Sequence, residues 1–259
     1  MQLKFGLRLG FSEVVSIVGG GGKSTLMFRL ADEIVAAGGR VVTTTTTRIF
    51  AAQTNIAPVH LVADHKGEFL NELKVMLERY PHVLVTGPVN SGSDKAYGIS
   101  SELVNDIVID SIDSDLTVIV EADGSRMRSL KVPAVHEPVI PKCTTIVVPV
   151  VGADIYNKLL NDNNVHRSKL AADMLDLGHQ SPITPEVVAR LLLHKLGGMK
   201  QVPHDARWIP FINKVSSRPT LNYASETAQL LLNGGVREVV VGALLDECPI
   251  VKRFSKVAA

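Results

Sequence analysis

The sequence predicts an α/β protein with a doubly wound, mostly parallel sheet, and three observations carry this prediction. Short, continuous apolar runs recur along the chain, and such runs are typical of strands buried on both faces of a parallel sheet. Amphipathic helical patterns lie between most of these runs. A glycine-rich segment joins the first apolar run to the first helical pattern, and polar residues follow several later runs. Ligands of such sheets bind at the carboxyl ends of the strands.

The elements alternate along nearly the whole chain. The predicted strands are 14–18, 40–44, 83–86, 116–121, 145–151, 208–213 and 238–243. The predicted helices are 23–37, 68–80, 101–112, 185–197 and 221–232. Gly38 and Gly39 favour an end for the first helix, whereas Thr184 as N-cap and Pro185 in the first turn favour the start of the fourth.

The most informative segment is Val18-Gly19-Gly20-Gly21-Gly22-Lys23-Ser24-Thr25. Glycines let a backbone turn tightly so that its N–H groups face phosphate oxygens, and the helix that begins there adds the positive end of its dipole. Gly20, Gly21, Gly22, Lys23, Ser24 and Thr25 are therefore predicted to bind a nucleotide, with a hydroxyl on Mg²⁺. Ile17 replaces the first glycine of the usual pattern, so the compressed form G-G-x-G-K-[ST] fits better. The alternative is a turn that binds nothing.

This loop makes the predicted sheet one of the P-loop NTPase type, with three segments. Residues 1–151 form the nucleotide-binding core, 152–205 a mostly helical insertion or subdomain, and 206–259 a strand–helix–strand unit that completes the sheet. The net charge of +1 gives no electrostatic footprint for nucleic acid. No apolar run reaches the roughly 20 residues of a membrane span, and the N-terminus leads directly into the loop. We expect a cytoplasmic protein without a nucleic-acid or membrane partner.

Two carboxylates follow the predicted strand 116–121. Glu121 ends a strongly apolar run, as in a Walker B element, and with the Ser24 hydroxyl it is the predicted Mg²⁺ site. Asp123 is the second metal candidate, but it is also suited to orient a nucleophile. Lys23 and Asp123 are therefore the predicted catalytic residues. A turn at Asp123-Gly124 is the structural alternative.

Two further strand ends carry polar residues. The five residues 43–47 are all threonine; they predict either an edge strand or a loop that brings Thr45, Thr46 and Thr47 to the metal and Arg48 to a phosphate. Asn213-Lys214 begins like the guanine-reading N-K-x-D motif, but Ser216 takes the place of its aspartate. The pair is predicted to contact the base or to cap the strand, and the choice between ATP and GTP stays open.

Substrate-facing candidates lie beyond Asp123. Arg126 follows it closely, His136 and Glu137 lie on a proline-rich connection of fixed shape, and His166-Arg167 begins the helical part. Histidines in such positions are also common as structural residues.

Several segments together resemble one family, YqeC, whose members are associated with selenium-dependent hydroxylases. They are the glycine loop, the threonine run, Glu121-Ala122-Asp123-Gly124-Ser125-Arg126, Leu130-Lys131-Val132-Pro133, His136-Glu137-Pro138-Val139-Ile140-Pro141, Val165-His166-Arg167, Ile183-Thr184-Pro185-Glu186 and Asn213-Lys214. The family's loop more often reads Gly-Ala-Gly-Gly-Lys-Thr, so Gly20 and Ser24 are compatible departures.

The resemblance implies a nucleotide-binding accessory protein in the maturation of molybdenum hydroxylases that carry labile selenium. Its partners would be such a hydroxylase or its cofactor-assembly proteins. Together with the residues, it predicts a Mg²⁺-dependent ATPase or GTPase. Two alternatives remain: a small-molecule kinase or ligase that holds a cofactor precursor with Asp123, Arg126 and His136, and a nucleotide-dependent chaperone without turnover.

Overall fold

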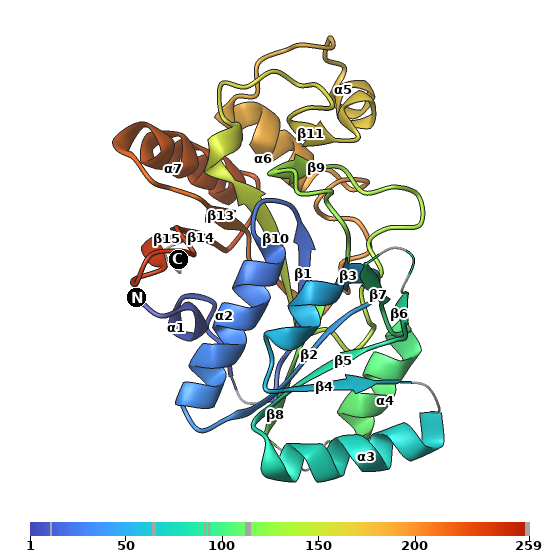
Figure 1. Ribbon diagram of the computed structural model, residues 1–259. Coiled ribbons are helices and arrows are strands. Elements are labelled where there is room, and N and C mark those ends of the chain that lie inside the picture. Colours follow the sequence, from blue (N-terminus) through green and yellow to red (C-terminus); the bar gives the residue numbers. More distant parts are fainter. Residues whose placement is uncertain (11, 64–65, 91, 93, 112–114, 257–259) are drawn as a thin grey trace.

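A large, mostly parallel sheet forms the centre of the molecule, which confirms the α/β prediction (Figure 1). The computed structural model describes all residues except 11, 64–65, 91, 93, 112–114 and 257–259. The strands of the sheet, in spatial order, are β15 (Ile250–Ser255), β14 (Glu238–Gly242), β13 (Phe211–Asn213), β10 (Ile146–Gly152), β1 (Val14–Gly19), β8 (Leu116–Glu121), β2 (Arg40–Thr45), β5 (His82–Thr86) and β4 (Val59–Val62), and β12 (Arg207–Trp208) also pairs with β10. Only the β14–β15 pair among them is antiparallel.

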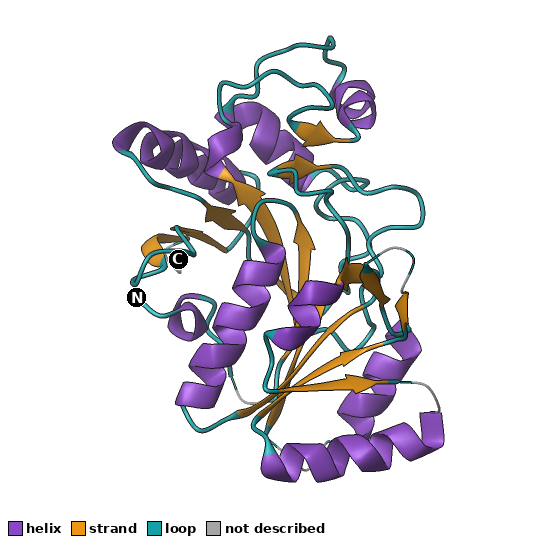
Figure 2. Ribbon diagram, viewed as in Figure 1, coloured by secondary structure: helices purple, strands orange, loops and turns teal. Residues whose placement is uncertain are grey.

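Helices cover both faces of this sheet (Figure 2). They are α1 (Leu3–Gly6), α2 (Lys23–Ala36), α3 (Lys66–Arg79), α4 (Ser101–Asp110), α5 (Ser168–Leu175), α6 (Pro185–Leu193) and α7 (Arg218–Asn233). Successive side chains along a strand point to opposite faces of the sheet, so alternate residues of β1 pack against different helices. Val15 and Ile17 pack with α2 on one face, whereas Val14 and Val18 pack with α3 and α4 on the other. The apolar strands thus bury both faces, as their sequence indicates.

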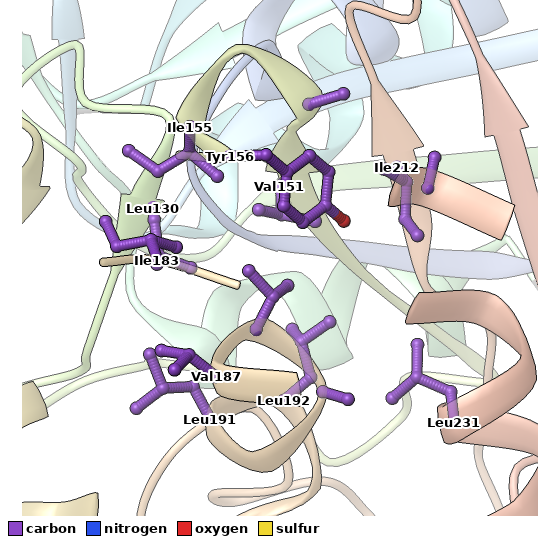
Figure 3. Close-up of a cluster of buried hydrophobic side chains, with 14 of the residues drawn as sticks. Leu130, Val151, Ile155, Tyr156, Ile183, Val187, Leu191, Leu192, Ile212 and Leu231 are labelled. Atoms are coloured by element: carbon purple, nitrogen blue, oxygen red, sulfur yellow. The ribbon is translucent and has the colours of Figure 1, made fainter. Parts of the chain in front are cut away.

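A third apolar cluster joins α5, α6 and α7 to the sheet (Figure 3). Leu191 and Leu192 of α6 pack there with Val151 of β10 and Ile212 of β13. Leu130 belongs to the same cluster and lies in β9 (Leu130–Lys131), which pairs with β11 (Val165–His166) outside the main sheet. The connection that follows β8 is therefore anchored between the sheet and the helices. The predicted boundaries at 151 and 205 stay a prediction. The segment between them is less helical than predicted, since its helices are α5, α6 and the short 3₁₀ turn 153–155, and turns and loops form most of the rest.

The order of the strands determines what meets the glycine loop. β1 lies between β8 and β10, and β8 lies between β1 and β2. These strands are parallel, and Glu121 is in register with both Ile17 and Thr45. The ends of β1, β8 and β2 therefore meet at one edge of the sheet, where the loop begins.

Several predicted boundaries are wrong, each for a local reason. The strand 208–213 is divided into β12 and β13, because Pro210 has no N–H for the ladder. β10 pairs with β12 at Ile146 and Val147 and with β13 at 150–152, so its own Pro149 lies opposite this interruption. The helix predicted to reach residue 197 ends at Leu193, because His194 is extended and the Gly198 N–H turns back to the Leu191 carbonyl at 3.0 Å.

Other differences concern edges and small elements. β2 lies inside the sheet, so the edge-strand alternative for the threonines is wrong. The predicted end of a helix at 112 lies outside the described residues, and α4 ends at Asp110. The elements without a sequence prediction are α1, β4, β15, β9, β11, the small sheet of β3 (Arg48–Phe50), β6 (Val89–Asn90) and β7 (Lys95–Tyr97), and the 3₁₀ turns η1 (Ala51–Asn55) and η2 (Ala153–Ile155). No helix in the described part of the chain has the length and apolarity to cross a bilayer.

Candidate functional site

The glycine loop follows β1 and ends where α2 begins at Lys23. It is packed so tightly that side chains are excluded. Gly21 has a φ of +83°, and a Cβ on it would lie 2.5 Å from the Gly152 nitrogen. Its carbonyl accepts a hydrogen bond from the Asn213 Nδ2 at 2.7 Å. Glycine is therefore required at this turn for both conformation and space.

The Lys23 ammonium lies inside the loop, between two carboxylates. It donates to the Gly19 carbonyl at 3.0 Å, and it lies 3.5 Å from Glu121 and 3.4 Å from Asp123. Burial opposes its charge, but the attraction of both carboxylates outweighs burial and raises the pKa of Lys23. The ammonium is thus held in its charged form at the point where the backbone turns, which is what neutralising a phosphate requires.

The two predicted Mg²⁺ ligands are in direct contact. The Ser24 hydroxyl, in the first turn of α2, donates to the Glu121 carboxylate at 2.7 Å. They meet because β8 pairs with β1, which brings the end of β8 beside the start of α2. A hydroxyl and a carboxylate are hard oxygen donors of the kind that Mg²⁺ takes, together with waters and phosphate oxygens. The pair therefore fits the cation.

Asp123 faces the loop backbone rather than open space. Its side chain is 3% exposed, and its two oxygens accept the Gly19 N–H at 3.1 and 2.9 Å. One of them also lies 3.0 Å from the Lys131 ammonium. In this structure Asp123 holds the beginning of the loop, and its predicted role at a nucleophile stays a prediction.

Lys131 continues this contact away from the loop. Its ammonium donates to Glu137 at 2.8 Å and to the Gly124 carbonyl at 2.7 Å. Arg167 is the last residue in this series of ion pairs, and its guanidinium donates two hydrogen bonds to the Glu137 carboxylate, at 2.8 and 3.1 Å. Burial opposes the charge of Glu137, but the hydrogen bonds from Arg167 and Lys131 prevail and lower its pKa to about 2. Glu137 and Arg167, predicted as substrate-facing, thus pair with each other.

Lys131 has no role predicted from its sequence position. Its side chain is 1% exposed, and the one signal in the sequence is a charged residue between Leu130 and Val132 in an apolar stretch. Buried lysines of this kind require carboxylate partners. The identity of those partners, Asp123 and Glu137, depends on the fold of the connection after β8.

The threonines at and after the end of β2 have different roles in the structure. The Thr45 hydroxyl donates to the Glu121 carbonyl at 2.8 Å and is fully buried. The Thr46 hydroxyl donates to the Val139 carbonyl at 2.7 Å, and the Thr47 N–H donates to the Thr45 hydroxyl at 3.1 Å. Thr45 therefore fastens β2 to β8, while Thr46 and Thr47 reach the cleft described below.

Asn213 and Lys214 occupy different environments although they are adjacent. Asn213 is buried and uses both ends of its amide within the protein, since its oxygen accepts the Leu244 N–H at 2.9 Å while its nitrogen holds the loop. The Lys214 ammonium donates to Ser129 at 2.7 Å and lies 3.1 Å from Asp154. Only Lys214 lines the cleft; base recognition by either residue stays a prediction.

An open cleft of about 860 Å³ lies over the loop. Most of the predicted site residues line it, namely Gly21, Gly22, Lys23, Ser24, Thr25, Thr46, Thr47, Glu121, Arg126, His136, Glu137, His166, Arg167 and Lys214. Gly20, Thr45, Asp123 and Asn213 are not among the lining residues. One wall of the cleft was not predicted from the sequence. It is formed by Ile49 and Phe50 of β3 and Gln53 of η1, beside the predicted phosphate partner Arg48. The cleft is within the size range of small-ligand sites.

The histidines of the cleft differ in surroundings. His136 is exposed on the proline-rich connection. Burial, followed by the charges of Arg167, Lys131 and Arg126, lowers the pKa of His166 to about 4. His166 is therefore neutral near pH 7, and the positive charge of this end of the cleft is carried by arginine and lysine side chains.

Comparison with known proteins gives a family and a distant structural likeness. The family model described as YqeC protein matches residues 15–169. A protein of Escherichia coli (strain K12) described as "Uncharacterized protein YqeC" is 32% identical over 248 residues, which cover 93% of this chain and 91% of that protein.

The solved structures are more remote. The signal recognition particle receptor FtsY from Elizabethkingia anophelis aligns with a TM-score of 0.41 and 14% identity, over 90% of this chain and 60% of that chain. The cell division protein FtsY from Thermotoga maritima aligns with a TM-score of 0.41 and 16% identity, over 89% of this chain and 62% of that chain. The chain thus spans less than two thirds of the length of either structure.

Proposed function

The chain belongs to the YqeC family, and we propose that it binds ATP or GTP with Mg²⁺ at its glycine loop and hydrolyses the terminal phosphoanhydride bond. One observation carries the proposal. The Lys23 ammonium lies inside the glycine loop, and the hydroxyl of the following residue, Ser24, donates a hydrogen bond to the Glu121 carboxylate at 2.7 Å. Phosphoryl transfer depends mainly on positioning and on the neutralisation of negative charge. Lys23 would neutralise the terminal phosphates, and Ser24 and Glu121 would hold the cation.

We further propose that this nucleotide cycle serves the maturation of a selenium-dependent molybdenum hydroxylase. The resemblance to the YqeC family supports this role, and the partner would be the hydroxylase or a protein that assembles its cofactor. The test is recovery of the hydroxylase, or of a cofactor-assembly protein, with the tagged chain in the presence of a non-hydrolysable nucleotide. If a Lys23→Ala variant recovers the same amount of that partner, the association does not depend on nucleotide binding.

A second candidate, transfer of the phosphoryl or nucleotidyl group to a small molecule, has one observation in its favour. The cleft continues beyond the loop to Arg126, His136 and His166. Turnover of ATP or GTP without a further substrate would support hydrolysis, and turnover only with an added metabolite would support transfer. Tight binding without turnover would instead support a nucleotide-dependent chaperone.

Thermal unfolding tests nucleotide binding itself. At a ligand concentration of a hundred times Kd, the free energy of unfolding should rise by about 2.7 kcal/mol. For a chain of this size that corresponds to roughly 5–10 °C in Tm. The measurement compares ATP and GTP with and without Mg²⁺. No change in Tm with either nucleotide would remove the basis of the proposal.

Lys23→Ala tests the residue that carries it. Charged hydrogen bonds to phosphate contribute about 1.5–3 kcal/mol, so the variant should bind nucleotide about 10- to 150-fold more weakly by isothermal titration. Because the substitution leaves Glu121 and Asp123 without their shared cation, circular dichroism must show that the variant is folded. Lys169→Ala, an exposed position on α5 outside the cleft, is the matched control and should bind as the wild type does.

A further inference from the structure

A second cavity of about 540 Å³ adjoins the cleft, with which it shares part of its lining. We call it the side pocket, and its lining residues are Arg126, Arg128, Asp162, Asn163, Val165, His166 and Arg167. It shares Arg126, His166 and Arg167 with the cleft, whereas Arg128 and Asn163 line only the side pocket. Its volume is in the range of small-ligand sites, so it adds room beyond the loop and its cleft.

The charge of the side pocket is positive after its internal pairs are considered. Arg167 is paired with Glu137. The carboxylate in the wall, Asp162, accepts the neutral Ser168 hydroxyl at 2.7 Å at the start of α5, so it keeps its charge and offsets one positive charge of the wall. Among the described residues, neither Arg126 nor Arg128 forms an ion pair with a carboxylate. Two guanidinium groups are therefore available to a ligand.

The backbone that carries the two arginines follows an unusual path. Arg126 and Met127 have left-handed φ values of 48° and 62°, and the Arg128 N–H closes a turn on the Ser125 carbonyl at 3.0 Å. The carbonyl of Arg128 packs on the loop, because a Cβ on Gly20 would lie 2.3 Å from it. The backbone of Arg128 thus touches the glycine loop, and the same residue lines the side pocket.

We propose that the side pocket binds the anionic group, a phosphate or a similar oxyanion, of a second small-molecule ligand beside the nucleotide. Guanidinium groups recognise such oxyanions through paired, charge-assisted hydrogen bonds. Val165 is the one apolar residue among the described residues that line the side pocket, so recognition there depends on polar and charged groups. This inference rests on the proposed function in that it assigns the cleft itself to the nucleotide.

The experiment titrates inorganic pyrophosphate into the full chain while a non-hydrolysable ATP analogue and Mg²⁺ saturate the glycine loop. One equivalent of pyrophosphate should still bind. Arg128→Gln should weaken this binding about 10- to 150-fold, as expected for the loss of a charged hydrogen-bond donor. It should leave the affinity for the analogue within about twofold, because Arg128 lines the side pocket and not the cleft. Arg218→Gln, an exposed arginine of α7 outside both cavities, should change neither affinity.

The outcomes separate this inference from the proposed function. The inference is overturned if pyrophosphate does not bind once the analogue is present, because the nucleotide then fills both cavities. It is equally overturned if Arg128→Gln and Arg218→Gln bind pyrophosphate alike. If the wild type binds neither ATP nor GTP but retains an Arg128-dependent site for pyrophosphate, the proposed function fails and the side pocket stands. Lys23→Ala should keep this site, because Lys23 does not line the side pocket.

Discussion

Acidic and basic side chains alternate from the glycine loop to the start of α5. Lys23 pairs with Asp123, Asp123 with Lys131, Lys131 with Glu137, and Glu137 with Arg167. Four of the five side chains are almost completely buried. The charges stabilise one another, but removing one partner of a buried pair leaves the other uncompensated at a cost of about 3–5 kcal/mol. Each of these five ion-paired residues therefore affects the geometry of its neighbours.

The two carboxylates at the end of β8 should have distinguishable effects on nucleotide affinity. We expect Glu121→Gln to reduce mainly the part of the affinity that depends on Mg²⁺, because its nearest partner is the Ser24 hydroxyl at 2.7 Å, whereas Lys23 lies 3.5 Å away and is also held by Asp123. Asp123→Asn should weaken binding with and without Mg²⁺ alike, since Asp123 holds the Gly19 N–H and Lys131. Titration of nucleotide at several Mg²⁺ concentrations measures both. Unchanged affinity with a loss of turnover of about 10²–10⁴ in Asp123→Asn would favour the nucleophile-orienting role instead.

Glu137 should make part of the stability dependent on acid. Its pKa falls from 4.5 to about 2 on folding, so its ion pairs stabilise the protein above about pH 4.5 and are lost as the pH falls toward 2. In Glu137→Gln this contribution is absent at every pH. We therefore expect the wild-type advantage in free energy of unfolding, measured with urea, to be constant above about pH 5 and to shrink toward about pH 3. An advantage that stays the same over this interval would contradict the pairing.

The glycine loop is the element whose shape depends most on backbone freedom. Gly21 and Gly38 have the same φ of +83°, but a Cβ would meet the Gly152 nitrogen at 2.5 Å in the first case and nothing within 4 Å in the second. Gly38→Ala should cost about 1–2 kcal/mol of stability for the left-handed backbone alone. Gly21→Ala should cost more and should also abolish nucleotide binding. Urea unfolding and titration of both variants give the comparison; equal costs would mean that the loop can move away from Gly152.

Prediction from the sequence succeeds for elements whose cause is local. The apolar runs identify β1, β8 and β10, and the glycines before Lys23 identify the loop, because each depends on residues within a few positions. Pro210 is also a local signal, but the predicted strand 208–213 runs through it. Its position opposite Pro149 has no local signal, because it depends on which strands are neighbours in the sheet.

The site was predictable to the same extent. Ser24 and Glu121 meet as expected, because parallel strands end at a common edge. The Lys131 partners and the wall from β3 and η1 depend on connections that leave the sheet and return to it. Arg128 gives no local signal either, since its placement follows from the left-handed turn before it. Long-range contacts of this kind are set by the whole fold rather than by a pattern in the sequence.

At the scale of the whole molecule, the series of ion pairs from Lys23 to Arg167 links the glycine loop to the start of α5. Lys131 lies in β9 and Arg167 directly precedes α5, and β9 pairs with β11. A phosphate that draws Lys23 away from Asp123 changes the charge that Lys131 and Glu137 experience. Nucleotide binding should therefore alter the stability of residues 130–138 and 165–175, although most of them lie outside the cleft.

Hydrogen exchange measured at early times, when only local openings contribute, tests this coupling. With a non-hydrolysable nucleotide and Mg²⁺, we expect slower exchange in the loop and in residues 130–138 and 165–175, and no change in α4, whose residues are not part of the cleft. Glu137→Gln should retain the protection of the loop and lose that of residues 165–175, because it interrupts the chain between Lys131 and Arg167. Protection of 165–175 that is equal in the variant and the wild type would show that the two parts are linked by packing at the apolar cluster around Leu130 rather than by charge.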